Sequence, residues 1–342
     1  MNQDALLERV KALCALNGTS GDEGAVADYI ARELENVCQV SRTPLGNLIA
    51  YKKGTNPDGK KRMLAAHMDE VGYIVTDVLE DGFLRFSTVG GVDVRVTVAK
   101  RVTVGEKNIP GVIGVKAIHL TKGDERGQAP EMDTLCIDIG AGSKEEAEKL
   151  ASPGDRVHFL SDWVDFGDDR VKAKALDDRA GCALLLELAK NETFEQDAYF
   201  VFTVCEEIGG SGAVTATNAL DPDYGIVVDV TTASDMPAVS KNVCAQGKGP
   251  VLSFKDGGTL YPRDLFLLAK KTAEEKNIPY QIKTYPSGGT DAGSIHKAVD
   301  GVKVVGVSLP GRYIHAGASV LKKSDLFASY DLLAALVDTV GC

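Results

Sequence analysis

Side chains that can bind a metal ion or transfer a proton stand at the ends of several strand-like runs in the sequence. They are His67 and Asp69 after the run 63–66, Asp177 at the junction 174–181, Glu206 and Glu207 after 198–205, Asp229 within 225–230, and His315 after 304–310. In open α/β sheets, ligands bind beyond the carboxyl ends of the strands. These side chains are therefore expected to meet at one edge of a single sheet.

Two histidines and several carboxylates at one edge predict bound cations, because so many acids in one place repel each other unless a cation compensates their charge. Mixed histidine and carboxylate ligands suit zinc, cobalt or manganese. Some of these side chains could have a purely structural role instead of binding a metal. Asp177 and Asp178 can cap a helix, and we expect Asp178 to do so. Adjacent glutamates usually lie on a solvated face, but Glu206 and Glu207 directly follow eight largely apolar residues.

The elements that must position these side chains alternate between helix and strand on both sides of a central stretch. Helices are expected near 1–16, 22–35, 178–190, 263–277, 292 and 324–340, and strands near 48–52, 61–67, 198–205, 225–230, 280–285 and 302–308. This alternation predicts an α/β fold with a mostly parallel sheet and helices on both faces. We expect residues 1–69 and 166–342 to form one discontinuous catalytic domain.

The central stretch, residues 70–165, is expected to form an inserted all-β domain. Strand-like pieces such as VRVTVA at 94–99 are separated by turn signals such as Asp81-Gly82. One helix stands out at 143–151, where Ser143 and Glu146 have the spacing of a capping box.

The composition excludes several classes of protein. The chain has 342 residues, a net charge of −11, 44% hydrophobic residues and 25% charged residues, which is typical of a soluble globular protein. Its acidity argues against nucleic-acid partners, which need a basic face, and its apolar runs fall short of the about 18 residues of a membrane span. Seven cysteines without CxxC pairs argue against a secreted disulfide framework. We expect a cytoplasmic protein without a membrane partner.

Six motifs, in their order along the chain, resemble the tetrahedral (TET-type) metallo-aminopeptidases. They are AHMDEVG, ALDDRAG, CEEIGGSGA, VVDV, GGTDAGSIH and RYIH. That family includes glutamyl and deblocking aminopeptidases, and some of its members are labelled endoglucanases. The resemblance spans nearly the whole chain, and it implies a zinc-exopeptidase-like fold whose inserted β-barrel-like domain mediates dimerisation.

The resemblance implies a dinuclear metal site. His67 and Asp229 would hold one divalent ion, Glu207 and His315 would hold the other, and Asp177 would bridge the two. Zinc and cobalt are the first candidates for these two ions, and manganese is the third.

Two further carboxylates match catalytic roles in the family. Glu206 matches the general acid/base, which takes a proton from the attacking water and returns it to the leaving amine. Asp69, two residues after His67, matches the carboxylate that orients this imidazole. The resemblance implies an aminopeptidase acting on short peptides, assembled as a tetrahedral dodecamer built from dimers.

The sequence leaves other enzymatic and non-enzymatic functions open. A related dinuclear carboxypeptidase or an N-acyl amino acid amidohydrolase can use the same ligands, and an endoglucanase needs two carboxylates flanking a sugar bond without metal. A non-catalytic scaffold fits the complete ligand set poorly.

Arg312, close to His315, either binds a substrate carboxylate or forms a structural salt bridge. Residues 208–212 and those after His315 depart from the usual family pattern, which leaves the preferred N-terminal residue open.

Overall fold

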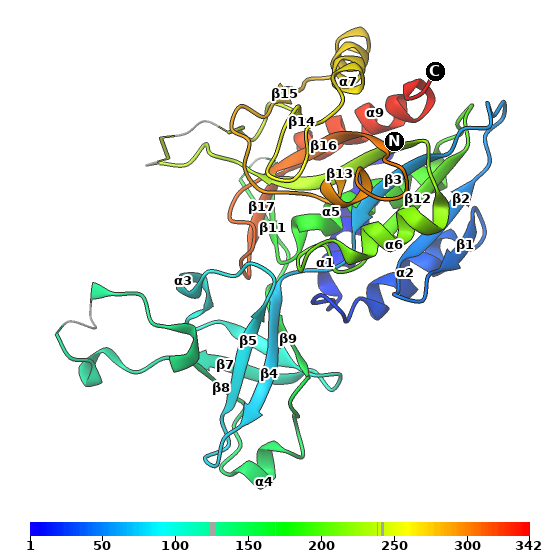
Figure 1. The fold of residues 1–342 in the computed structure, drawn as a ribbon. Coiled ribbons are helices and arrows are strands. Elements are labelled where there is room, and N and C mark those ends of the chain that lie inside the picture. Colours follow the sequence, from blue (N-terminus) through cyan, green and yellow to red (C-terminus); the bar gives the residue numbers. More distant parts are fainter. Residues whose placement is uncertain (124–126, 168, 238, 241–242) are drawn as a thin grey trace.

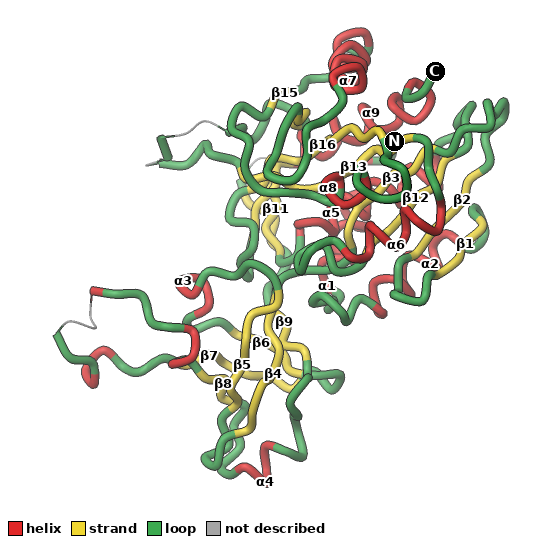
Figure 2. Tube along the Cα trace, viewed as in Figure 1, coloured by secondary structure: helices red, strands yellow, loops and turns green. Residues whose placement is uncertain are grey.

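An α/β body and a projecting β-rich part make up the computed structural model of the chain (Figure 1). It describes residues 1–123, 127–167, 169–237, 239–240 and 243–342. Strands and helices are mixed in the body, whereas strands and loops dominate the projecting part (Figure 2). The projecting part lies within the expected insertion 70–165, of which residues 124–126 fall outside the described residues.

The body is built on an eight-stranded sheet with the order β1-β2-β12-β3-β13-β16-β14-β15. The central strands β12, β3, β13 and β16 are parallel to one another. Outside them, β2 joins β12 and β14 joins β16 in antiparallel pairs. The expected mostly parallel sheet is therefore a mixed sheet with a parallel centre. The bounds of its strands are β1 Gln39–Arg42, β2 Leu48–Lys52, β3 Arg62–His67, β12 Ala198–Thr203, β13 Tyr224–Thr232, β14 Val251–Ser253, β15 Gln281–Ile282 and β16 Lys303–Gly311.

Helices cover both faces of this sheet, as expected from the sequence. They are α1 Gln3–Ala15, α2 Gly24–Leu34, α5 Leu176–Asn191, α6 Ser211–Leu220, α7 Arg263–Glu275, α8 Ala292–Ile295 and α9 Lys323–Thr339. Successive side chains of a strand point to opposite faces. Accordingly, Leu64 and Ala66 of β3 join the core formed with α1, α2, α5 and α9, while Met63 and Ala65 join the core formed with α6 and α8. Burial on both faces explains why the central strands read as continuous apolar runs.

The projecting part contains a closed barrel with its own hydrophobic core. Its strands pair in the order β4-β5-β8-β7-β6-β9. They are β4 Gly72–Val78, β5 Leu84–Val89, β6 Arg101–Val104, β7 Ile109–Gly114, β8 Cys136–Asp138 and β9 Arg156–Phe159. The helix expected at 143–151 is the shorter α4, Lys144–Ala147, whose N-cap Ser143 accepts the N–H of Glu146.

The run 94–99, expected as a strand, instead contains the helical turn α3, Val94–Thr97. The Asp93 carboxylate accepts the N–H of Arg95 at 2.8 Å, and the Thr97 hydroxyl donates to the Asp93 carbonyl at 3.2 Å. Short alternation of valine with polar residues does not distinguish the two conformations, so this capping by Asp93 decides for the helix.

A small antiparallel sheet leads the chain into the candidate site. It joins β10 Val164–Phe166, β11 Arg170–Ala173 and β17 Ser319–Lys322. Strand β11 runs directly into the start of α5, where Asp177 lies. Each helix in the described ranges is too short or too polar to cross a membrane, and all seven cysteines carry free thiols.

Candidate metal centre

The predicted side chains gather at one edge of the central sheet. His67 is the last residue of β3, and Glu206 and Glu207 follow β12 closely. In the register of the parallel pair, His67 lies beside Thr203. Asp229 lies in β13 beside Ser308 of β16. Because these strands run in the same direction, their carboxyl ends share one edge, as the sequence predicts.

Asp177 lies between the two histidines, with one carboxylate oxygen facing each. Its Oδ1 is 3.3 Å from His67 Nε2, which is also 3.8 Å from Asp229 Oδ1. Its Oδ2 is 3.8 Å from His315 Nε2, which is 3.4 Å from Glu207 Oε2. The five side chains thus form two groups that share the Asp177 carboxylate.

Both histidines turn Nε2 toward these carboxylates and Nδ1 away from them. His67 Nδ1 lies 3.1 Å from the carbonyl oxygen of Asp69 and 3.4 Å from its Oδ1. His315 Nδ1 lies 3.0 Å from the carbonyl oxygen of Gly91, which belongs to the projecting part of the chain. A ring proton held on Nδ1 by these carbonyl oxygens would leave the Nε2 lone pair free for a bound cation.

The Asp69 carboxylate is completely buried and connects three segments. It accepts the Ser20 hydroxyl at 2.6 Å, the backbone N–H of Glu206 at 3.0 Å and that of Glu207 at 3.1 Å. Burial alone would raise its pKa, but His67, Ser20 and the backbone donors hold the pKa below its ordinary value. Asp69 is therefore an ionised anchor for the glutamate pair as well as for His67.

Glu206, Glu207 and Asp229 hold their protons more tightly than ordinary carboxyl groups do. Burial, followed by repulsion from neighbouring carboxylates, raises the pKa of Glu206 to about 10 and that of Glu207 well above its ordinary value. The same causes raise the pKa of Asp229 to about 6, against the opposing effect of His67. Burial would lower the pKa of His67, but hydrogen bonds to Asp177, Asp229 and Asp69 raise it well above 6.5. Raised pKa values of this kind mean that the cluster binds protons readily, and a bound metal cation would supply the same positive charge.

The donor set fits divalent cations. His67, Asp177 and Glu207 offer ligand atoms within 4.8 Å of one another, and so do His67, Asp178 and Asp229. Asp178 is fully buried, and among the described residues its Oδ2 has no hydrogen-bond partner. Imidazole nitrogens combined with carboxylate oxygens are typical ligands of zinc, cobalt and manganese, and they do not distinguish these metals.

Comparison of the whole sequence with known families identifies its relatives. Residues 46–332 match the sequence profile of the M42 glutamyl aminopeptidase family. The chain belongs to the M42 family. This places it among aminopeptidases and confirms the resemblance read from the six motifs.

Relatives of this M42 protein match it over almost their full length. A provisionally named aminopeptidase of Acetivibrio thermocellus is 38% identical, with 97% of this chain and 98% of the relative covered. A lysyl aminopeptidase of Pyrococcus furiosus is 33% identical (97% and 96% covered). A glutamyl aminopeptidase of Lactococcus lactis is 31% identical (98% and 97% covered).

Solved structures agree with the fold. An aminopeptidase from Desulfurococcus kamchatkensis has a TM-score of 0.93 at 35% identity, with 98% of this chain and 95% of that chain covered. The Pyrococcus horikoshii TET1 peptidase, which assembles into a tetrahedron or a large octahedral shell, has a TM-score of 0.89 at 33% identity (98% and 100% covered). A Thermotoga maritima structure named as an endoglucanase has a TM-score of 0.80 at 35% identity (96% of each chain).

Some residues of the M42 site escaped the sequence analysis. Asp178 caps α5 as expected, since its Oδ1 accepts the N–H of Gly181 at 3.0 Å, but it also lies against the ligand cluster. Asp291 is also buried, interacts electrostatically with His67, Asp69 and Asp229, and accepts the Thr203 hydroxyl at 2.5 Å. The sequence analysis gave Asp178 only the role of a helix cap, and Asp291 does not directly follow an expected strand. The Gly-Gly pair before Asp291, which the resemblance places near the site, was the available signal.

Glu23 is a third residue that the sequence analysis missed. Its Oε1 accepts the N–H of Cys205 at 3.1 Å and that of Gly21 at 2.8 Å. Cys205 has a φ of 58°, in the left-handed region, so the chain turns sharply just before Glu206. Glu23 thus stabilises the turn that presents the glutamate pair.

The M42 cluster opens into a cavity of about 500 Å³. Its lining comprises His67, Gly91, Asp177, Glu206, Glu207, residues 229–232, Lys283, residues 287–290, Ile314 and His315. Room for a peptide end therefore adjoins the candidate ligands and Glu206.

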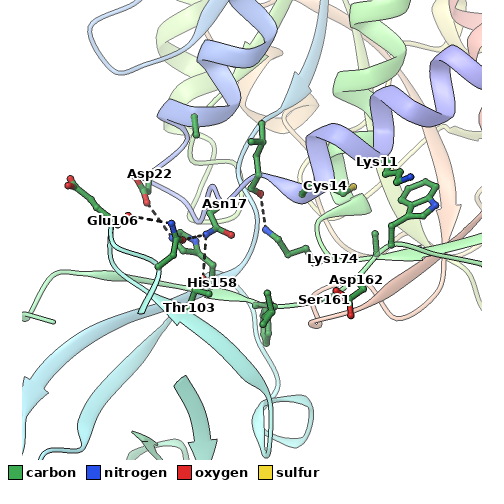
Figure 3. A pocket seen from close by; sticks show the side chains of 18 of the residues that line it. Lys11, Cys14, Asn17, Asp22, Thr103, Glu106, His158, Ser161, Asp162 and Lys174 are labelled. Atoms are coloured by element: carbon green, nitrogen blue, oxygen red, sulfur yellow. Dashed lines mark hydrogen bonds and ion pairs between the residues drawn. The ribbon is translucent and has the colours of Figure 1, made fainter. Parts of the chain in front are cut away.

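A larger cavity, of about 770 Å³, lies elsewhere, where the segment after α1 meets the barrel (Figure 3). None of the candidate residues lines it. Its polar side chains pair with one another or with neighbours: His158 contacts Thr19 at 2.9 Å, and Asn17 donates to Asn108 at 2.6 Å. Size alone therefore does not mark the site.

Proposed function

We propose that this M42 protein is a two-metal aminopeptidase that removes N-terminal residues from short peptides. The observation that carries the proposal is the position of Asp177, whose two carboxylate oxygens face His67 and His315 in a cavity that Glu206 also lines. A carboxylate that lies between two histidines is the arrangement expected for a bridged metal pair, and each histidine here also has a second acid beside it, Asp229 or Glu207.

The proposed ligands divide between two ions. His67 and Asp229 hold one ion, Glu207 and His315 hold the other, and Asp177 bridges them. The contacts of 3.3–3.8 Å between these side chains support this division. Bound divalent ions supply a water of lowered pKa and polarise the scissile carbonyl. Zinc, cobalt and manganese are the candidate metals.

Glu206 acts as the general acid/base in this proposal. It is not one of the five proposed ligands, and two bound cations would offset the repulsion from neighbouring carboxylates that, together with burial, raises its pKa. Its carboxylate is then free to take a proton from the attacking water and to return it to the leaving amine. Asp69 holds the backbone of Glu206 and the ring of His67 at the same time. The catalytic group and one ligand are thereby fixed relative to each other before the substrate binds.

We further propose that residues 1–69 and 166–342 form the catalytic domain and that residues 70–165 mediate dimerisation. Apolar side chains on the projecting part support an interface: Ile118 is 60% exposed and Leu120 is 70% exposed. By similarity to the TET1 peptidase, we propose that the dimers build a tetrahedral dodecamer, and we propose a cytoplasmic location for this assembly. A native mass of one subunit would contradict the assembly without affecting the chemistry.

The function is tested with metal-depleted protein reloaded with zinc, cobalt or manganese. Amino-acyl anilides are expected to be hydrolysed by the loaded protein, and N-acetyl amino acids and peptides with a blocked N-terminus are expected to resist it. Turnover of the blocked substrates alone would favour an amidohydrolase, and release of C-terminal residues would favour a carboxypeptidase. Activity on cellulose that survives chelation would favour an endoglucanase.

A further inference from the structure

Lys283 is a buried cation in the wall of the metal-centre cavity. It follows β15, lines the cavity and is only 5% exposed. Its Nζ donates to the carbonyl oxygen of Ser287 at 2.7 Å. Among the described residues that line this cavity, Lys283 is the only lysine or arginine.

Lys283 differs from Lys174, the other lysine that is buried in the described part of the chain, in having no close counter-ion. Lys174 is 4% exposed, and its Nζ lies 2.5 Å from Glu70 Oε1. No carboxylate in the described part of the chain lies within 4.0 Å of the Lys283 ammonium. Asp256 and Asp229 act on it only at longer range, and burial lowers its pKa. A buried ammonium without a counter-ion is costly unless a ligand brings one.

Arg312 cannot take the role of substrate cation that its position near His315 suggested. Its guanidinium donates to both oxygens of the Asp235 carboxylate, at 2.8 and 2.7 Å. The structural salt bridge considered for Arg312 is therefore the arrangement present, and Lys283 is left as the cation facing the cavity. The cavity lining also includes the uncharged polar side chains of Thr231, Thr232 and Thr290.

We propose that Lys283 selects substrates with an acidic N-terminal residue by pairing with the side-chain carboxylate of glutamate or aspartate. This inference rests on the proposed aminopeptidase function and specifies its substrate class. Membership of the family does not settle the preference, because relatives are named as both lysyl and glutamyl aminopeptidases. A site whose buried polar group needs a partner rejects substrates that lack one.

The test compares kcat/KM of the metal-loaded protein for glutamyl, aspartyl, leucyl and lysyl anilides. We expect the acidic substrates to exceed the leucyl one by at least about tenfold. In Lys283→Met this ratio should fall by at least about tenfold, mainly through the KM of the acidic substrates, with metal content little changed. Lys297→Met, on the exposed surface, is the matched control and should keep the wild-type ratio.

The outcomes separate the two proposals. If no anilide is hydrolysed, the aminopeptidase function fails. If anilides are hydrolysed but the acidic preference is absent or survives in Lys283→Met, only the role of Lys283 is overturned. A lysine that instead binds the C-terminal carboxylate of a dipeptide would make Lys283→Met lose activity on Leu-Leu but not on Leu-Leu-amide, which would also overturn it. Lys283→Gln replaces Lys283→Met in every comparison if the latter fails to fold.

Discussion

Asp69 Oδ1 accepts the backbone N–H of Glu206 at 3.0 Å, across the gap between the end of β3 and the turn after β12. The same carboxylate contacts His67 Nδ1 at 3.4 Å. One buried anion therefore fixes both the proposed general base and one proposed metal ligand. A substitution of Asp69 is therefore expected to disturb both the position of Glu206 and the orientation of His67.

Asp69→Asn is expected to lower metal affinity and turnover by roughly 10–100-fold. An amide has one acceptor oxygen and one NH₂ group, so it cannot accept all the donors that now surround Asp69. Metal titration and kcat at saturating metal measure the two effects. Ser20→Ala is the matched control, because it removes one donor to Asp69 and leaves the backbone donors in place; its metal affinity should stay within about threefold. Equal effects of the two variants would contradict the anchoring role.

Glu206→Gln is expected to keep two metal ions per subunit and to lose about 10²–10⁴-fold in kcat. The glutamine side chain has nearly the same shape but cannot take up the proton of the attacking water. Metal content by elemental analysis and kcat on an amino-acyl anilide give the two readouts. Near-normal turnover would remove Glu206 from the acid/base role, and loss of metal would reassign it as a ligand.

The positions of the site residues could be predicted because strand ends in a parallel sheet share an edge. His67, Asp229 and the glutamate pair each follow or end a buried apolar run, which is visible in the sequence. Asp291 and Glu23 could not be found in this way. They reach the site from loops, and only the packing of β12 against its neighbours brings them there.

The sequence failed to predict those helices and strand pairings whose local sequence pattern is weak. The helical turn α3 depends on Asp93, whose capping bonds outweigh the alternating valines of the run. Helix α6 begins just after Gly209 and Gly210, both at positive φ, and was not expected from the sequence. The antiparallel pairing of β14 with β16 depends on contacts far apart in the chain, which local pattern does not encode.

Metal stoichiometry should distinguish the bridging residue from the terminal ligands. In Asp177→Asn both ions are expected to bind at least about tenfold more weakly, because Asp177 is the residue that faces both histidines. His315→Ala should weaken one ion only, leaving the site next to His67 and Asp229 intact. Calorimetric titration with zinc measures both steps. An Asp177→Asn protein that still binds one ion with wild-type affinity would contradict the bridge.

Asp291→Asn is expected to make the metal-free protein less sensitive to rising pH. Burial, with repulsion from Asp69 and Asp229, raises the pKa of Asp291 from 3.8 to about 7. A raised carboxyl pKa means that the folded state binds the proton more tightly than the unfolded chain. Its stabilising contribution is complete below about pH 4 and is lost as the pH rises through 7, on the order of 4 kcal/mol in full. Thermal unfolding at pH 5 and pH 8 measures the loss, which should be smaller in the variant.

Thr203→Val is expected to have the opposite effect to Asp291→Asn on the pH dependence of stability. The Thr203 hydroxyl donates to Asp291 Oδ2 at 2.5 Å and so lowers the pKa of that carboxyl. Without this donor, the ionised form of Asp291 loses support, and the Tm of metal-free Thr203→Val should fall more steeply between pH 5 and pH 8 than that of the wild type. Parallel Tm curves for wild type and both variants would show that Asp291 does not titrate in this range.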